Sequence, residues 1–204
     1  MNLAMSAKAV PLFEAVKTFI KNEIDPITAE YFRLGDGRSN RWQYGEGQLE
    51  LLNSVKAKAK KAGLWNFFLP NAETGEGLSN LDYAYIANEL GKNPIASECF
   101  NCSAPDTGNM EVLERVGTPE QKKRWLEPLL AGEIRSAYAM TEPDVASSDA
   151  KNLECRAVKD GDEWLINGEK FYISGAGDPR CKILICMLRT SQDGPPHGRH
   201  SQIL

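Results

Sequence analysis

The sequence has 204 residues, and its 24 Lys and Arg against 28 Asp and Glu give a formal net charge of −4 at pH 7. Because 42% of the residues are hydrophobic and 25% are charged, the composition indicates one or two globular domains and excludes a disordered or fibrous chain. The slight acidic excess argues against nucleic acid as a partner, since binding to a phosphate backbone requires clustered positive charge.

Apolar residues recur at helical spacing through the first two thirds of the sequence. Between residues 10 and 24 they return every three or four positions, so this segment is predicted to be a helix that Pro26 ends. Gly63, Gly91 and Gly117 each follow a further segment of this kind, as expected for residues that end a helix. The predicted helices cover residues 10–24, 48–62, 80–90, 109–116 and 118–132.

The last of these helices has the clearest boundaries. Thr118 is a suitable N-cap, Pro119 suits the first turn, and Gln121 can complete a capping box with Thr118. Gly132 is placed to end the helix. We therefore predict an all-helical amino-terminal domain over residues 1–134.

After residue 134 the pattern changes to short apolar or alternating runs. Asp160-Gly161 and Asn167-Gly168 separate some of these runs, and the second pair is a strong hairpin signal. The longest wholly apolar run, residues 183–188, is too short to span a membrane. The predicted strands cover residues 136–141, 153–158, 163–166, 170–174 and 182–188.

Helices followed by strands predict the α+β fold class. We expect the first part of an antiparallel β domain over residues 135–204. The sequence has no β-α-β alternation and no GxGxxG motif, which excludes a parallel dinucleotide-binding sheet.

The five cysteines indicate reduced thiols rather than a disulfide framework, because their number is odd and no secretory signal precedes them. Cys99 and Cys102 could in principle bind zinc together with Cys181 and Cys186. The two pairs are much farther apart in the sequence than the pairs of a structural zinc site usually are. We therefore expect buried, inert thiols and no metal site.

Two segments near the predicted β domain carry polar groups that suit a ligand. Residues 138–149 leave a predicted strand, pass Pro143 and gather small hydroxyl and amide groups, which can donate several hydrogen bonds to a bound polar ring or a phosphate. In residues 170–177, Tyr172 and Ser174 would share one face of a strand, which suits a planar heterocycle. The simpler alternatives are a polar turn and a core tyrosine.

Together the two segments resemble signatures of the acyl-CoA dehydrogenase family. Residues 138–149 are similar to that family's Tyr-x-x-Thr-Glu-Pro motif, and residues 167–175 to its Asn-Gly-x-Lys-x-Trp-Ile-Thr segment. Residues 117–126 resemble the helix that precedes the first motif. Residues 63–70 and 101–110 resemble the branch whose vertebrate members carry a phosphotransferase-like domain ahead of the dehydrogenase.

This resemblance implies a subunit of three parts, with a helical domain, a β domain and a carboxy-terminal helical bundle. We expect this chain to supply the first part and some of the second, without the bundle. The family's reaction is the FAD-dependent α,β-dehydrogenation of an acyl-CoA, and its proton-abstracting carboxylate belongs to the bundle. No catalytic residue is therefore expected here, and Glu142, next to Pro143 in the signature, is not expected to be that base.

The resemblance also implies partners and a location. The implied partners are an acyl-CoA substrate, an electron-acceptor flavoprotein and, for the full-length protein, further copies of the same chain in a homodimer or homotetramer. The expected location is intracellular, in the cytoplasm of a bacterium or in the mitochondria or peroxisomes of a eukaryote. The alternative is a truncated short form that cannot dehydrogenate and acts at most as a binding or subunit-interaction module.

The resemblance finally implies roles for single residues. Met140 and Thr141 would lie at the pyrimidine edge of the flavin, Tyr172 would cover the flavin face away from the substrate, and Ser174 would approach N5. Tyr172 and Ser174 stand where the family has Trp and Thr. Either Ser147 or Ser148 matches the family serine that lies between the FAD phosphates and the CoA. The residues implied to bind FAD are Tyr138, Met140, Thr141, Ser147, Tyr172 and Ser174, and those implied to bind acyl-CoA are Ser147 and Ser148.

Overall fold

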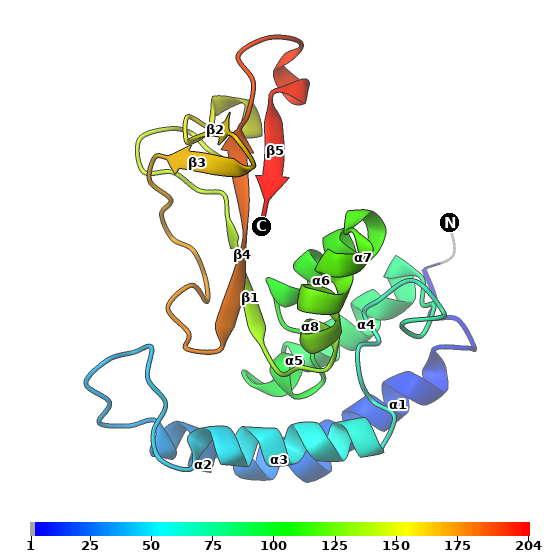
Figure 1. Ribbon diagram of the computed structural model, residues 1–204. Helices are drawn as coiled ribbons and strands as arrows, with labels where there is room; N and C mark the ends of the chain where they lie inside the picture. Colours follow the sequence, from blue (N-terminus) through cyan, green and yellow to red (C-terminus); the bar gives the residue numbers. More distant parts are fainter. Residues whose placement is uncertain (1–2) are drawn as a thin grey trace. The chain divides into compact units, whose positions relative to one another are not determined.

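The computed structural model describes residues 3–204, which form two compact units divided between Glu111 and Val112. The first unit is helical, and the second contains helices followed by a sheet (Figure 1). The prediction of an α+β fold with helices before strands is confirmed. Among residues 3–204, no helix combines the length and the apolar character that a membrane crossing requires.

The first unit consists of helices of different lengths. In chain order its elements are α1 (Val10–Phe19), the π-helical turn η1 (Ile20–Ile24), α2 (Asp25–Leu34), α3 (Gln48–Lys61), α4 (Asn80–Leu90), α5 (Ala96–Cys99) and the start of α6 (Asp106–Val116). Helix α4 has the predicted bounds, and its N-cap Ser79 accepts a hydrogen bond from the Asp82 N–H. Helix α2 packs against α3, as Figure 1 shows.

The prediction that Pro26 ends the first helix is wrong. Helical backbone continues from α1 through η1 into α2, and Pro26 lies in the first turn of α2. The preceding π-helical turn is wider than an α-helical one, and in it the Asp25 N–H bonds to the Ile20 carbonyl. The same arrangement recurs where a second π-helical turn, η2 (Lys122–Leu126), precedes Pro128 in α8 (Glu127–Leu130). In both places a π-helical turn allows a helix to pass a proline that would otherwise break it.

The core of the first unit is built around Phe100. Its side chain is fully buried, and its ring centroid lies 5.3 Å from that of Phe19 and 5.5 Å from that of Phe67. Next to it, Asn101 donates a hydrogen bond from Nδ2 to Asn66 Oδ1 over 2.7 Å, and the Asn66 N–H bonds to the Phe100 carbonyl. Both asparagines have positive φ, a conformation that Asn tolerates better than most residues.

The second unit contains a five-stranded sheet. After α6 its elements are α7 (Pro119–Gln121), η2, α8, β1 (Arg135–Ala139), η3 (Ala150–Asn152), β2 (Arg156–Asp160), β3 (Glu163–Asn167), β4 (Cys181–Arg189), η4 (Pro196–Gly198) and β5 (His200–Ile203). The predicted capping box is confirmed, since the Gln121 N–H bonds to the Thr118 hydroxyl and the Gln121 side chain accepts from the Thr118 N–H.

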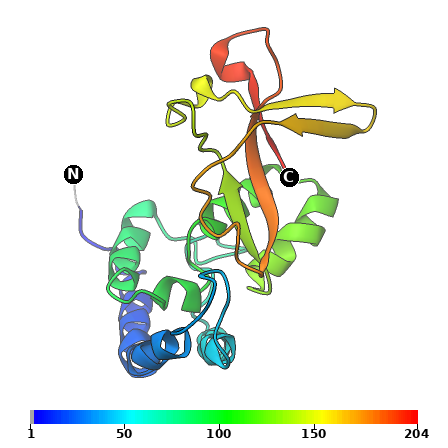
Figure 2. The ribbon, with the colours of Figure 1, turned by 90° about the vertical axis from the view of Figure 1, so that its left-hand side faces the viewer.

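The sheet is mixed, which differs from the antiparallel arrangement predicted. Strand β4 lies between β1 and β2, runs parallel to both, and pairs antiparallel with β5. Strands β2 and β3 form an antiparallel hairpin that extends away from β4 in Figure 2. The long connection from β1 to β4 allows the parallel pairing, which a short turn would not.

Two local predictions for the second unit are wrong. Residues 170–174 form no strand, because Tyr172 has a φ of +53° that an extended chain cannot contain. Asn167-Gly168 is not a hairpin turn, since the turn between β2 and β3 is made by Gly161 and Asp162. Gly168 lies instead against Cys155, and a Cβ added to Gly168 would be 2.7 Å from Cys155 Sγ. The glycine is required by this close approach of two chain segments.

Candidate functional site

The two segments with motif-like sequences lie side by side in the second unit. The Phe171 N–H donates a hydrogen bond to the Thr141 carbonyl over 2.8 Å. Lys170 Nζ donates another to the Met140 carbonyl over 2.9 Å. Residues that are far apart in the sequence are therefore in contact directly after the end of β1.

Several side chains at this junction are open to a ligand. Thr141 and Ser174 are exposed, and Tyr172 is 83% exposed. Tyr172 has a positive φ, which is uncommon for a bulky residue and occurs often at functional sites. An exposed aromatic ring on a constrained backbone can offer its face to a planar heterocycle.

Tyr138 and Met140 are half-buried near the end of β1. The Tyr138 hydroxyl accepts a hydrogen bond from Gln202 Nε2 over 3.2 Å, so it is engaged with β5. Met140 contributes its carbonyl oxygen to Lys170. These two residues therefore connect β1 to neighbouring parts of the second unit.

The two serines near the end of residues 138–149 have different surroundings. Ser147 is buried, and its Oγ accepts a hydrogen bond from the Glu142 N–H over 3.1 Å. Ser148 is exposed. Ser147 therefore closes the loop onto itself, although its hydroxyl hydrogen can still be donated to another group, while Ser148 faces solvent.

A buried ion pair joins the two motif segments. Lys170 Nζ lies 2.8 Å from Glu142 Oε1, and only 12% of the lysine side chain and 6% of the glutamate side chain are exposed. The Glu142 carboxylate also accepts hydrogen bonds from the Glu154 N–H over 2.7 Å and the Cys155 N–H over 3.0 Å. Burial alone would raise the pKa of Glu142, but Lys170 and these two N–H donors outweigh it and hold that pKa below its ordinary value. Glu142 is therefore a buried carboxylate that is engaged with one ammonium group and two backbone N–H groups.

Sequence reasoning did not assign a role to Lys170. The available signal was a Glu in one motif and a Lys in the other, which can pair when the two segments meet. The backbone N–H groups of Glu154 and Cys155 carry no sequence signal, because every residue except proline has such a donor.

Two cavities lie beside this loop in the second unit. One, of about 230 Å³, is lined by residues that include Glu142, Pro143 and Gly168. The other, of about 390 Å³, is lined mainly by polar side chains, including Lys151 and Arg189. Within the described part of the chain, the buried Nε of Arg189 has no hydrogen-bond partner. The loop thus has polar space next to it that a ligand could enter.

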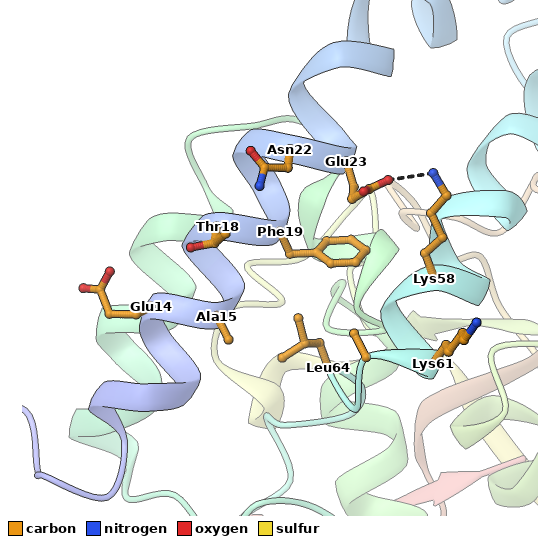
Figure 3. Close-up of a pocket in the computed structure, with 10 residues that line it drawn as sticks. Glu14, Ala15, Thr18, Phe19, Asn22, Glu23, Lys58, Lys61 and Leu64 are labelled. Carbon is orange, nitrogen blue, oxygen red and sulfur yellow. Dashed lines mark hydrogen bonds and ion pairs between the residues drawn. The ribbon is translucent and has the colours of Figure 1, made fainter.

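A larger cavity, of about 650 Å³, lies in the first unit and is lined by no residue of 138–149 or 167–175. Phe19 and Leu64 line it between α1 and the end of α3, and Glu23 of η1 pairs with Lys58 across it over 2.6 Å (Figure 3). Both partners of this ion pair are substantially exposed, so it contributes little to stability. The size of a cavity does not by itself identify the functional site.

Cys99, Cys102 and Cys155 are buried, as expected, whereas Cys181 and Cys186 are only partly buried, contrary to the expectation of five buried thiols. Cys99 and Cys102 are buried and free, and burial raises the pKa of each to about 12. Both therefore stay protonated at neutral pH. In residues 3–204, no three His, Cys, Asp or Glu side chains gather in a way that could hold a metal ion.

Comparison with known proteins assigns both units to one family. The acyl-CoA dehydrogenase N-terminal domain matches residues 9–133, and the acyl-CoA dehydrogenase middle domain matches residues 137–204. Acyl-CoA dehydrogenase family member 11 of Gallus gallus is 47% identical over 203 residues, which are 98% of this chain and 25% of that protein. The probable acyl-CoA dehydrogenase FadE2 of Mycobacterium tuberculosis is 46% identical over 205 residues, which cover 100% of this chain and 49% of that protein.

Solved structures agree with this assignment. A putative acyl-CoA dehydrogenase from Mycobacterium abscessus has a TM-score of 0.87 and 48% identity, over 98% of this chain and 50% of that one. An FAD complex of PigA has a TM-score of 0.70 over 95% of this chain and 46% of that one, and at 23% identity it supports the fold alone. The chain spans about half the length of these bacterial relatives and about a quarter of the vertebrate one. It belongs to the acyl-CoA dehydrogenase family of flavin-dependent oxidoreductases.

Proposed function

We propose that this chain provides the flavin-binding junction of an FAD-dependent acyl-CoA dehydrogenase. In the proposed reaction a carboxylate would take the α-proton of the acyl thioester, and FAD, when bound, would supply the acceptor for the β-hydrogen as hydride, so that the product would be a trans-2-enoyl thioester. The observation that carries the proposal is the hydrogen bond from the Phe171 N–H to the Thr141 carbonyl, because it joins the two segments that family resemblance assigns to the flavin.

The environments at the junction support roles for five residues, of which Thr141, Tyr172 and Ser174 are exposed and Tyr138 and Met140 are half-buried. Met140 and Thr141 would hydrogen-bond the pyrimidine edge of the flavin through backbone N–H groups and the Thr141 hydroxyl. Donors at that edge stabilise the negative charge that develops during reduction. The exposed Tyr172 ring would stack on the flavin face away from the substrate, with Ser174 near N5. Tyr138 would help to form the wall of the site.

The different environments of Ser147 and Ser148 support different roles for the two serines in ligand binding. The buried Ser147 would hold the loop through its bond from the Glu142 N–H and donate its remaining hydrogen toward the FAD phosphates or the CoA. The exposed Ser148 would contact the CoA. Both roles rest on hydroxyl donors, which suit phosphate and amide oxygens.

The proton-abstracting carboxylate is proposed to lie outside these 204 residues. Glu142 is the acidic residue of the motif, but its carboxylate is engaged with a lysine and two N–H groups. The whole protein is proposed to act on an acyl-CoA inside the cell as a homodimer or homotetramer and to pass electrons to an acceptor flavoprotein. The alternative function is that of a binding or subunit-interaction module: the 204-residue chain alone would bind a ligand or another subunit and would not dehydrogenate an acyl-CoA.

Replacing Thr141 tests the proposed flavin edge. Thr141→Val keeps the side-chain shape but removes a hydroxyl donor, so FAD binding should weaken by about 1 to 3 kcal/mol. Titration of FAD with the protein, followed by flavin fluorescence, measures the dissociation constant. Thr18→Val, at an exposed position on α1, is the matched control and should leave FAD affinity unchanged. Equal affinities for wild type and Thr141→Val would remove Thr141 from the site.

A further inference from the structure

The Lys170 ammonium connects three chain segments. Its Nζ donates hydrogen bonds to the Met140 carbonyl over 2.9 Å, to Glu142 Oε1 over 2.8 Å and to the Met187 carbonyl over 2.7 Å. An ammonium group has three N–H donors, so this set uses all of them. Lys170 therefore holds its own segment, residues 138–149 and β4 together at one point.

The Glu142 carboxylate connects the same point to the loop before β2. It accepts hydrogen bonds from Lys170, from the Glu154 N–H and from the Cys155 N–H. A buried ion pair costs free energy unless hydrogen bonds satisfy the rest of its polar atoms, and here both ions have several partners. The lowered pKa of Glu142 keeps its carboxylate charged at neutral pH.

The contacts made by residues 170 and 171 define the backbone around Thr141. Lys170 binds the carbonyl of Met140, which belongs to the same peptide group as the Thr141 N–H. Phe171 binds the carbonyl on the other side of Thr141. Because a peptide group is planar and trans, a donor that fixes the Met140 carbonyl also fixes the opposite direction of the Thr141 N–H. A cation on that carbonyl further polarises the N–H and makes it a stronger donor.

We propose that Lys170 and Glu142 are positioning residues of the flavin site, which orient and polarise the Thr141 N–H so that it stabilises reduced flavin more than oxidised flavin. This inference rests on the proposed function, since it gives the Thr141 N–H a flavin to bind. Neither residue touches the flavin. Each acts through the backbone that it holds.

The double variant Lys170→Met with Glu142→Gln is the main test. Removing both charges avoids leaving one buried charge unpaired, so the double variant should remain folded, whereas Lys170→Met alone would leave the Glu142 carboxylate buried without its cation. Lys58→Met is the matched control, because it also breaks a lysine–glutamate pair, at an exposed position in the first unit.

The first measurement needs no flavin. Hydrogen exchange of backbone amides, followed by NMR in the 204-residue chain, should show faster exchange at Phe171, Glu154 and Cys155 by at least about tenfold in the double variant. Amides within the β2–β3 hairpin should be unchanged. Unchanged exchange at Phe171, Glu154 and Cys155 would overturn the positioning role, whatever the chain binds.

The second measurement compares oxidised and anaerobically reduced FAD. NMR titration of the same chain detects even weak binding, and the double variant should lose at least about tenfold more affinity for reduced than for oxidised FAD. Lys58→Met should keep the wild-type ratio. Equal losses for the two forms would mean a purely structural role and would overturn the inference. If the wild-type chain shows no FAD binding at Thr141, the proposed function is refuted, and the flavin part of the inference is refuted with it. The hydrogen-exchange experiment then still decides whether Lys170 and Glu142 position the backbone.

Discussion

Gly168→Ala should destabilise the second unit by about 2 to 4 kcal/mol, because it combines backbone strain with a steric clash. Gly168 has a φ of +138°, which residues with a side chain rarely adopt. Its new Cβ would lie 2.7 Å from Cys155 Sγ and 2.9 Å from Cys155 Cα. Since the Cys155 N–H binds Glu142, a displaced Cys155 would also disturb the ion pair that joins the two motif segments.

Urea unfolding followed by circular dichroism measures this loss. Gly161→Ala is the matched control, because Gly161 also has a positive φ, +60°, but a Cβ there would meet no atom within 4 Å. The control should cost only about 1 to 2 kcal/mol for the left-handed conformation. If the two variants lose the same stability, the close packing of Gly168 against Cys155 is incorrect.

Phe100→Ala should reduce the free energy of unfolding of the first unit by about 3 to 5 kcal/mol. The Phe100 side chain is fully buried between the rings of Phe19 and Phe67, so its removal leaves a cavity that its neighbours can fill only in part. Phe32→Ala on α2 is the control. Because Phe32 is 48% exposed, this variant should lose much less of its free energy of unfolding. Thermal and urea unfolding check both variants, and similar losses would contradict the assignment of Phe100 to the centre of the core.

Helix boundaries were predicted well where they depend only on residues that are near one another in the sequence. The bounds of α4 and the capping box of Thr118 and Gln121 follow from residues only a few positions apart. Pro26 misled the prediction, because its effect depends on whether the preceding turn is α-helical or π-helical. Propensity rules describe a proline in an ordinary helix and do not include this wider turn.

Predictions for the second unit failed where distant residues decide the conformation. Asn167-Gly168 has the composition of a hairpin turn, but Gly168 is required by its contact with Cys155 rather than by a turn. The alternation in residues 170–174 suggested a strand, whereas the hydrogen bonds of Lys170 and Phe171 to the first motif hold this segment in an irregular conformation. Strand direction also depended on the long connection between β1 and β4, for which the sequence has no simple signal.

The sequence identified the two segments of the candidate site, but it could not predict how their residues contact one another. Resemblance identified Thr141 and Tyr172, and the structure brings the backbone around them into contact through Phe171. The burial of Ser147 and the exposure of Ser148 could not be read from two adjacent serines. The role of Lys170 depends on two acceptors in residues 138–149 and one in β4, and no periodicity or spacing in the sequence connects them with Lys170.

The most direct test of the proposed flavin junction is an NMR titration of the ¹⁵N-labelled 204-residue chain with FAD. The amide signals of Met140, Thr141, Tyr172 and Ser174 should shift together as FAD is added. Signals of the large cavity between α1 and α3, including those of Phe19 and Lys58, should not move. Shifts at that cavity with none at Thr141 and Tyr172, or no shifts at all, would contradict the proposal that the two motif segments form a flavin site.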